Sequence, residues 1–189
     1  MCERLTTDKY AVTAFCALWL GAVASVGAQA ETAGLERYFE ELADPAFDGW
    51  ARAEADIERA WSHSGSAAMD VLLKRGQAAL DEGDVAGAID HLTALTDHAP
   101  EFAEGWNARA TAYFVAGRYG PSMADIAHVL HLEPRHWGAL AGLGMILDEM
   151  GDGPRALSAF QASFALNPHQ QDVKDAIERL QAELEGTAL

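Results

Sequence analysis

Apolar, small and helix-breaking residues recur at a fixed interval of 34 residues along the second part of this chain. The interval is clearest in three prolines, Pro100, Pro134 and Pro168. Each interval holds two stretches with apolar residues at helical spacing, and a glycine separates them. A period of this length is typical of solenoids, in which each helical hairpin buries its apolar face against the next. We therefore predict three tandem helical hairpins over residues 67–170.

Counting back from each proline finds the same chemistry at the same offset in all three intervals. A large residue stands in the first helix, and a small residue follows one turn later, where the two helices must approach closely. A glycine then ends the first helix, since it enters the left-handed region freely. The second helix adds another small position and a large apolar one. These positions are, in order, Leu72, Trp106 and Leu140; Gly76, Ala110 and Gly144; Gly83, Gly117 and Gly151; Ala88, Ser122 and Ala156; Leu92, Ile126 and Phe160.

The middle interval resembles a tetratricopeptide repeat, and its two neighbours match it closely. The residues that carry the resemblance are Trp106, Ala110, Tyr113, Gly117, Ser122, Ile126 and Pro134. The resemblance implies an all-α solenoid of three hairpins, at about 69–102, 103–136 and 137–170. It also implies a non-catalytic scaffold or assembly factor that binds a protein or peptide.

Residues 1–30 have the pattern of a signal peptide. Two basic residues, Arg4 and Lys9, precede an apolar run, and Ala28-Gln29-Ala30 has the small residues that a signal peptidase requires. An uncleaved membrane anchor is the alternative, although the run is at the short end for a span. We predict cleavage after Ala30, a periplasmic location in the bacterial envelope, and no stable membrane insertion afterwards.

The segments on either side of the three hairpins are predicted to cap the two ends of the solenoid. Residues 31–66 predict a degenerate helical hairpin at the N-terminal end, in which Asp44 and Pro45 begin a helix that runs to Trp61. Residues 171–189 predict a capping helix with a polar outer face, which the last repeat of a solenoid needs. Its apolar stripe is short for a coiled coil, so a monomer is favoured over a dimer.

The composition of the chain limits the classes of partner that it can bind. The formal net charge is −16 with a pI near 4.6, which argues against nucleic acid and anionic lipid because both need a positive surface. The acidity serves either solubility or a cationic partner. Both cysteines, Cys2 and Cys16, lie in the leader, so the mature chain would have neither a disulfide nor a thiolate site.

The candidate chemistry is sparse. No nucleophile motif occurs, and we predict no enzymatic activity and no cofactor. The strongest metal-like pattern is His128, His131 and His136, of which the first two stand one helical turn apart and could reach Zn²⁺ or Cu²⁺. A solvated helix face explains the same pattern, and a metal or haem carrier is kept as the alternative function.

The first helices of the hairpins offer a concave groove to a ligand. Family members that hold a peptide's terminal carboxylate carry lysine, arginine and asparagine at positions where this chain has Leu73, Gln77, Ala108, Gly138 and Gly142. The carboxylate clamp is therefore absent, and the two glycines are expected to face the groove.

A groove that is apolar in the middle and acidic at its edge favours a peptide with apolar anchors and a basic flank. Asn107 is the expected backbone clamp, because its amide both donates and accepts. Alternatively, Leu73 and Phe114 pack against neighbouring helices and the groove is only partly open. The predicted groove residues are Leu73, Gln77, Asn107, Thr111, Phe114, Met145 and Asp148.

Overall fold

The computed structural model describes residues 34–187, and within that range it contains helices and no strands. The predicted signal peptide, residues 1–30, lies outside the described residues. No helix of the described part is both long and apolar enough to cross a membrane. A first helix spans residues 34–43. The others are α2 (Trp50–Trp61), α3 (Ala67–Asp81), α4 (Val85–His98), α5 (Ala103–Val115), α6 (Tyr119–Leu132), α7 (Trp137–Glu149), α8 (Gly153–Leu166) and α9 (Gln171–Thr187).

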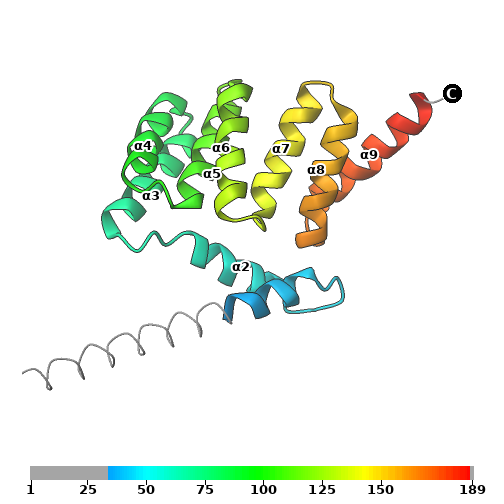
Figure 1. Cartoon of the computed structure of the whole chain (residues 1–189), viewed down its shortest axis with the longest axis horizontal. Helices are drawn as coiled ribbons and strands as arrows, with labels where there is room; N and C mark the ends of the chain where they lie inside the picture. The colour runs from blue at the N-terminus through cyan, green and yellow to red at the C-terminus, as the bar shows by residue number, and fades with distance from the viewer. Residues whose placement is uncertain (1–33, 188–189) are drawn as a thin grey trace, which may run out of the picture.

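Helices α3 to α8 form three hairpins that stand side by side in one row (Figure 1), as the 34-residue period predicts. The turn of each hairpin is a glycine in the left-handed region, at φ +80° for Gly83, +68° for Gly117 and +77° for Gly151. Second helices begin at once, and the carboxylates of Asp84 and Asp152 accept N–H groups of the first turn. These caps satisfy donors that would otherwise be unpaired.

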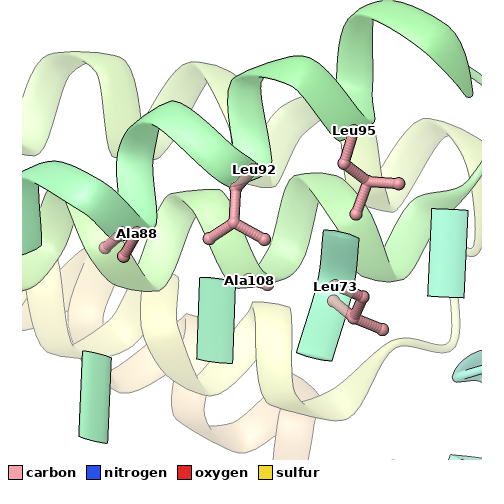
Figure 2. Close-up of a cluster of buried hydrophobic side chains, with 6 residues drawn as sticks. Leu73, Ala88, Leu92, Leu95 and Ala108 are labelled. Carbon is pink, nitrogen blue, oxygen red and sulfur yellow. The ribbon is translucent and has the colours of Figure 1, made fainter. Parts of the chain in front are cut away.

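The small positions of the repeat are where the helices of a hairpin meet. A Cβ on Gly76 would lie 2.4 Å from Cγ of Leu92, so only glycine allows this approach. In the second hairpin, the Ser122 hydroxyl donates to the Ala110 carbonyl across 2.7 Å. Figure 2 shows the resulting core of the first hairpin, a cluster of buried residues that joins α3, α4 and α5.

A buried ion pair joins the two helices of the second hairpin, and its arginine also binds the first hairpin. Arg109 on α5 donates to both carboxylate oxygens of Asp125 on α6, at 2.7 and 2.8 Å. Its third nitrogen, Nη1, donates to the hydroxyl of Thr96 on α4 at 2.7 Å. The Asp125 carboxylate, as hydrogen-bond acceptor and counter-charge, raises the pKa of Arg109 above its ordinary value. Three helices are thereby joined through one guanidinium.

The N-terminal segment, residues 34–62, lies in a different place from the one predicted. It passes along one edge of the row of hairpins (Figure 1) and does not extend the row before α3. Its apolar residues Phe39, Leu42 and Ile57 pack in one cluster with Trp137, the first residue of α7. The segment therefore covers the turns that end the second and third hairpins.

Polar contacts fix that position. Glu36 accepts from Arg135 at 2.8 Å, and Glu54 accepts from Asn167 at 2.7 Å. Both partners stand next to repeat prolines, in the turns that follow the second and third hairpins. Helix α2 also begins later than predicted, at Trp50, because the Asp44 carboxylate accepts the N–H of Ala46 at 2.9 Å and so closes a separate turn.

Helix α9 covers the end of the third hairpin, as predicted. Val173 and Leu180 are buried against α7 and α8 in a shared cluster. Arg179 pairs with Asp148 of α7 and with Glu183 one turn further along α9. The exposed faces of the helix are charged, in keeping with a terminal cap.

Candidate ligand-binding groove

An apolar cavity of about 180 Å³ opens between α5 and α7. Helix α5 provides one wall and α7 the other, and side chains of α6 form part of the lining. Most of the lining is apolar or small, and the polar groups are few, as in peptide and small-molecule sites generally. The lining residues are Asn107, Ala110, Thr111, Phe114, Ser122, Ile126, Gly138, Ala139, Ala141, Gly142, Met145 and Ile146.

Two glycines on α7 keep this cavity open. Gly138 and Gly142 stand one helical turn apart and both line it, as predicted. A Cβ on Gly142 would meet only Cδ1 of Ile126, at 3.7 Å, and a Cβ on Gly138 only the ring of His136, at 3.5 Å or more. Both are ordinary van der Waals distances. The packing therefore does not require glycine at these two positions, although it does at Gly144, where a Cβ would lie 2.7 Å from Phe160.

Asn107 stands at the centre of the groove. Its Nδ2 donates long hydrogen bonds to the Glu104 carboxylate, at 3.3 and 3.5 Å, and its backbone carbonyl accepts from the Thr111 hydroxyl. Its side-chain carbonyl has no partner among the described residues, so it can accept from an incoming peptide N–H. The acceptor half of the predicted clamp is therefore available, while the donor half is engaged by Glu104.

A second, polar cavity of about 300 Å³ adjoins the first. It shares Asn107 and Gly138 with the apolar cavity, so the two form one continuous groove. Its far wall is the end of α2. The lining residues are Glu58, Trp61, Ser62, Gln77, Glu104, Asn107, His136, Trp137 and Gly138.

Two acidic side chains, Glu58 and Glu104, line this second cavity, and neighbouring groups determine their hydrogen bonds and the pKa of Glu58. His136 accepts the N–H of Ala139 at Nδ1 and therefore caps α7, which leaves Nε2–H to donate to Glu104 at 3.1 Å. In that arrangement the proton of the His136 ring is on Nε2, facing the Glu104 carboxylate. Burial, together with the nearby carboxylates of Glu54 and Glu104, raises the pKa of Glu58 above its ordinary value.

The predicted groove residues divide into three groups. Asn107, Thr111, Phe114 and Met145 line the apolar cavity, and Gln77 lines the polar one. Leu73 does not belong to the groove: it is 2% exposed and packs in the core of the first hairpin (Figure 2), because α4 covers its side of α3. Asp148 lines neither of these two cavities, and its carboxylate pairs with Arg179 of α9. The acidic end of the groove is at α2 instead.

The three histidines of the metal hypothesis are not brought together. The His128 ring lies tilted against Trp106, with ring centres 4.1 Å apart, whereas His136 is buried and stacks on Trp61 at 4.3 Å. His131 is exposed near the end of α6. Among the described residues, no group of three or more His, Cys, Asp or Glu side chains is placed to hold a metal ion.

Sequence reasoning missed the polar cavity because the repeat register says nothing about where the N-terminal segment packs. Glu58, Trp61 and His136 come together only through that packing. Glu104 carried a usable signal, since it stands three residues before Asn107 and so shares its helix face.

No protein-family model matches the chain. A curated relative and several solved structures do resemble it, and they support the helical-repeat architecture. A TPR repeat-containing protein of Rhizobium etli is 37% identical over 131 residues, which cover 69% of this chain and 64% of the relative. The chain thus spans somewhat less than two thirds of that relative.

Solved structures share the fold at lower identity. The TPR domain of Sgt2 from Aspergillus fumigatus superposes with a TM-score of 0.61 at 22% identity, over 65% of this chain and 83% of that one. The first TPR domain of Spaghetti (RPAP3), bound to the HSP90 peptide SRMEEVD, gives 0.60 at 20% identity, over 62% and 93%. MamA gives 0.58 at 22% identity, over 75% and 79%.

Proposed function

We propose that this chain is a tetratricopeptide repeat protein and that it acts as a non-catalytic module that binds an extended peptide segment of a partner protein. Its fold and the 37% identity to the Rhizobium etli relative support the family. The ligand lies in the groove between α5 and α7. Apolar side chains of the peptide fill the cavity at Phe114 and Met145, and Asn107 accepts a backbone N–H.

The apolar cavity is the observation that carries this proposal. A core helix that needed only to pack would gain by having alanine at Gly142, since glycine costs about 0.5–1 kcal/mol relative to alanine in a helix interior. The neighbouring atoms leave room for a Cβ there and at Gly138 in the first turn. Glycine there maintains open apolar surface, which soluble proteins expose mainly where a partner covers it.

The chemistry of the groove differs from what an acidic peptide needs. The RPAP3 domain was solved with SRMEEVD, a peptide that ends in acidic residues. In this chain, no Lys or Arg stands among the described residues that line the two cavities, and Glu58 and Glu104 do. We therefore do not extend that ligand to this protein. Its partner segment is apolar with a basic flank.

A cavity-filling variant tests the proposal. A displayed library of random dodecapeptides is selected on the full chain, and the dissociation constants of enriched peptides are measured for wild type and Gly142→Leu. The new side chain occupies the apolar cavity from a position that tolerates it, so the helix should remain intact while affinity falls at least about tenfold, which equals 1.4 kcal/mol. Gly120→Leu is the control, because Gly120 is exposed on α6 and has no atom within 4 Å of its Cβ position.

Two results would contradict the proposal. One is a selection that enriches no peptide. The other is an enriched peptide that binds wild type and Gly142→Leu equally, since the groove would then not be the site.

The place of action is part of the same proposal. The leader pattern in residues 1–30 supports export to the bacterial cell envelope, where the module would serve an assembly process as a monomer. An intact-mass measurement on the periplasmic fraction should find a chain that begins at Glu31. A dominant species that retains Cys16 would contradict export with cleavage.

A further inference from the structure

From the cavity at the end of α2, we infer that this protein has a dedicated subsite for an arginine side chain of the bound peptide, formed by Glu58, Glu104 and the ring of Trp61. The inference rests on the proposed peptide-binding function and specifies the partner's chemistry. It places the guanidinium next to the apolar cavity, beyond Asn107.

Charge is the first argument. Two carboxylates, those of Glu58 and Glu104, line this cavity, and no lysine or arginine stands among the described residues that line it. His136 donates its Nε2–H to Glu104, because its Nδ1 accepts the N–H of Ala139. Glu58 forms no ion pair with another described residue, and burial, followed by the nearby carboxylates of Glu54 and Glu104, raises its pKa. A cationic group entering the cavity would relieve this repulsion.

The aromatic wall is the second, independent argument. Trp61 and Trp137 both line the cavity, but Trp137 is only 5% exposed and the ring of His136 stacks on one face of Trp61, so the half-buried Trp61 provides the accessible aromatic surface. Tryptophan faces attract cations, and a planar guanidinium stacks on them while it forms paired hydrogen bonds to carboxylates. Arginine therefore fits the site better than lysine, whose compact ammonium is more strongly hydrated.

Size and position complete the argument. A cavity of about 300 Å³ is at the lower end for small-molecule sites, so it suits one long side chain better than a cofactor. Because Asn107 and Gly138 line both cavities, the cationic and apolar subsites are contiguous. One short peptide can reach both. The end of α2 forms part of the subsite, which gives the packing of the N-terminal segment a function.

The test uses N-acetyl-arginine amide as the probe, titrated into the ¹⁵N-labelled full chain. Indole N–H signals of Trp61 and Trp137, assigned with Trp61→Phe and Trp137→Phe, should shift and saturate. N-acetyl-citrulline amide has nearly the same shape without the charge, and its affinity should be at least tenfold lower. Glu58→Gln should weaken the arginine probe about threefold to tenfold, the range for a partly exposed charge pair beside an aromatic ring.

Matched variants distinguish the arginine subsite from the apolar cavity. Glu185→Gln on α9 removes the same charge at an exposed position away from the cavity, and should change nothing. Gly142→Leu fills only the apolar cavity, and should leave the arginine probe unaffected while selected peptides are lost. The inference is overturned if the two probes bind equally, if neither shifts the indole signals, or if Glu58→Gln binds the arginine probe as wild type does. Selected peptides would still test the groove in each case.

Discussion

Breaking the Arg109–Asp125 ion pair should destabilise the solenoid more than any surface change. In Asp125→Ala the guanidinium loses two hydrogen bonds, at 2.7 and 2.8 Å, and its counter-charge. The Arg109 side chain is only 12% exposed, so water can replace little of what is lost. It keeps its bond to Thr96 and its contact with the Trp106 ring, 4.7 Å away.

The size of the effect follows from these contacts. Removing one partner of a buried pair costs about 3–5 kcal/mol, and the contacts that Arg109 retains place this case at the lower end, about 3 kcal/mol. For a chain of this size, the melting temperature should fall by roughly 6–12 °C. Arg109→Leu combined with Asp125→Ala should cost less than the sum of the two single changes, because no charge is then left buried alone.

Urea unfolding followed by circular dichroism measures these free energies of unfolding. Glu178→Ala is the control, since its ion pair with Lys174 spans 3.9 Å between exposed side chains and should contribute no more than about 0.5 kcal/mol. If Asp125→Ala costs as little as the control, or if the double variant is additive, the pair does not stabilise the packing of α5 against α6 as described.

Three further outcomes follow from the packing and the charges. Ala88→Leu should cost about 1–3 kcal/mol by overpacking, because Ala88 is fully buried, whereas exposed Asp90→Leu should be nearly silent; equal effects in urea melts would contradict the register. In a ¹³C pH titration, the pKa of the Glu58 carboxyl should lie above that of an ordinary glutamate. Because its pKa is raised in the folded state, the charged carboxylate lowers the free energy of unfolding at high pH, and this loss is relieved as the pH falls through the folded-state pKa. An ordinary or lowered pKa would contradict the burial and crowding of this carboxylate. Zinc should leave the melting temperature of wild type and of the His128→Ala, His131→Ala double variant unchanged, and a zinc-dependent rise that is lost in the variant would revive the carrier hypothesis.

The row of hairpins could be predicted because its rules are local and repeat three times. Each interval needs a glycine at the turn and small residues where the helices meet, and the contact of Gly76 with Leu92 shows why. The capping helix α9 was predictable from its apolar stripe for the same reason.

The position of the N-terminal segment could not be predicted in that way. It depends on contacts between residues far apart in sequence, such as Phe39 with Trp137 and Glu54 with Asn167. The polar cavity depends on that position and was missed with it. Leu73 was misplaced for a smaller reason: its offset allows either the groove or the core, and only the packing of α4 decides between them.

Site-specific photocrosslinking tests the central claim, that the partner segment lies between α5 and α7, most directly. A benzoylphenylalanine replaces either Met145, which lines the apolar cavity and is 46% exposed, or Met150, which is 54% exposed and lines neither cavity. A selected dodecapeptide should crosslink to the chain with the probe at position 145 and not to the chain with the probe at position 150. Equal crosslinking from both positions, or crosslinking from position 150 alone, would contradict the account.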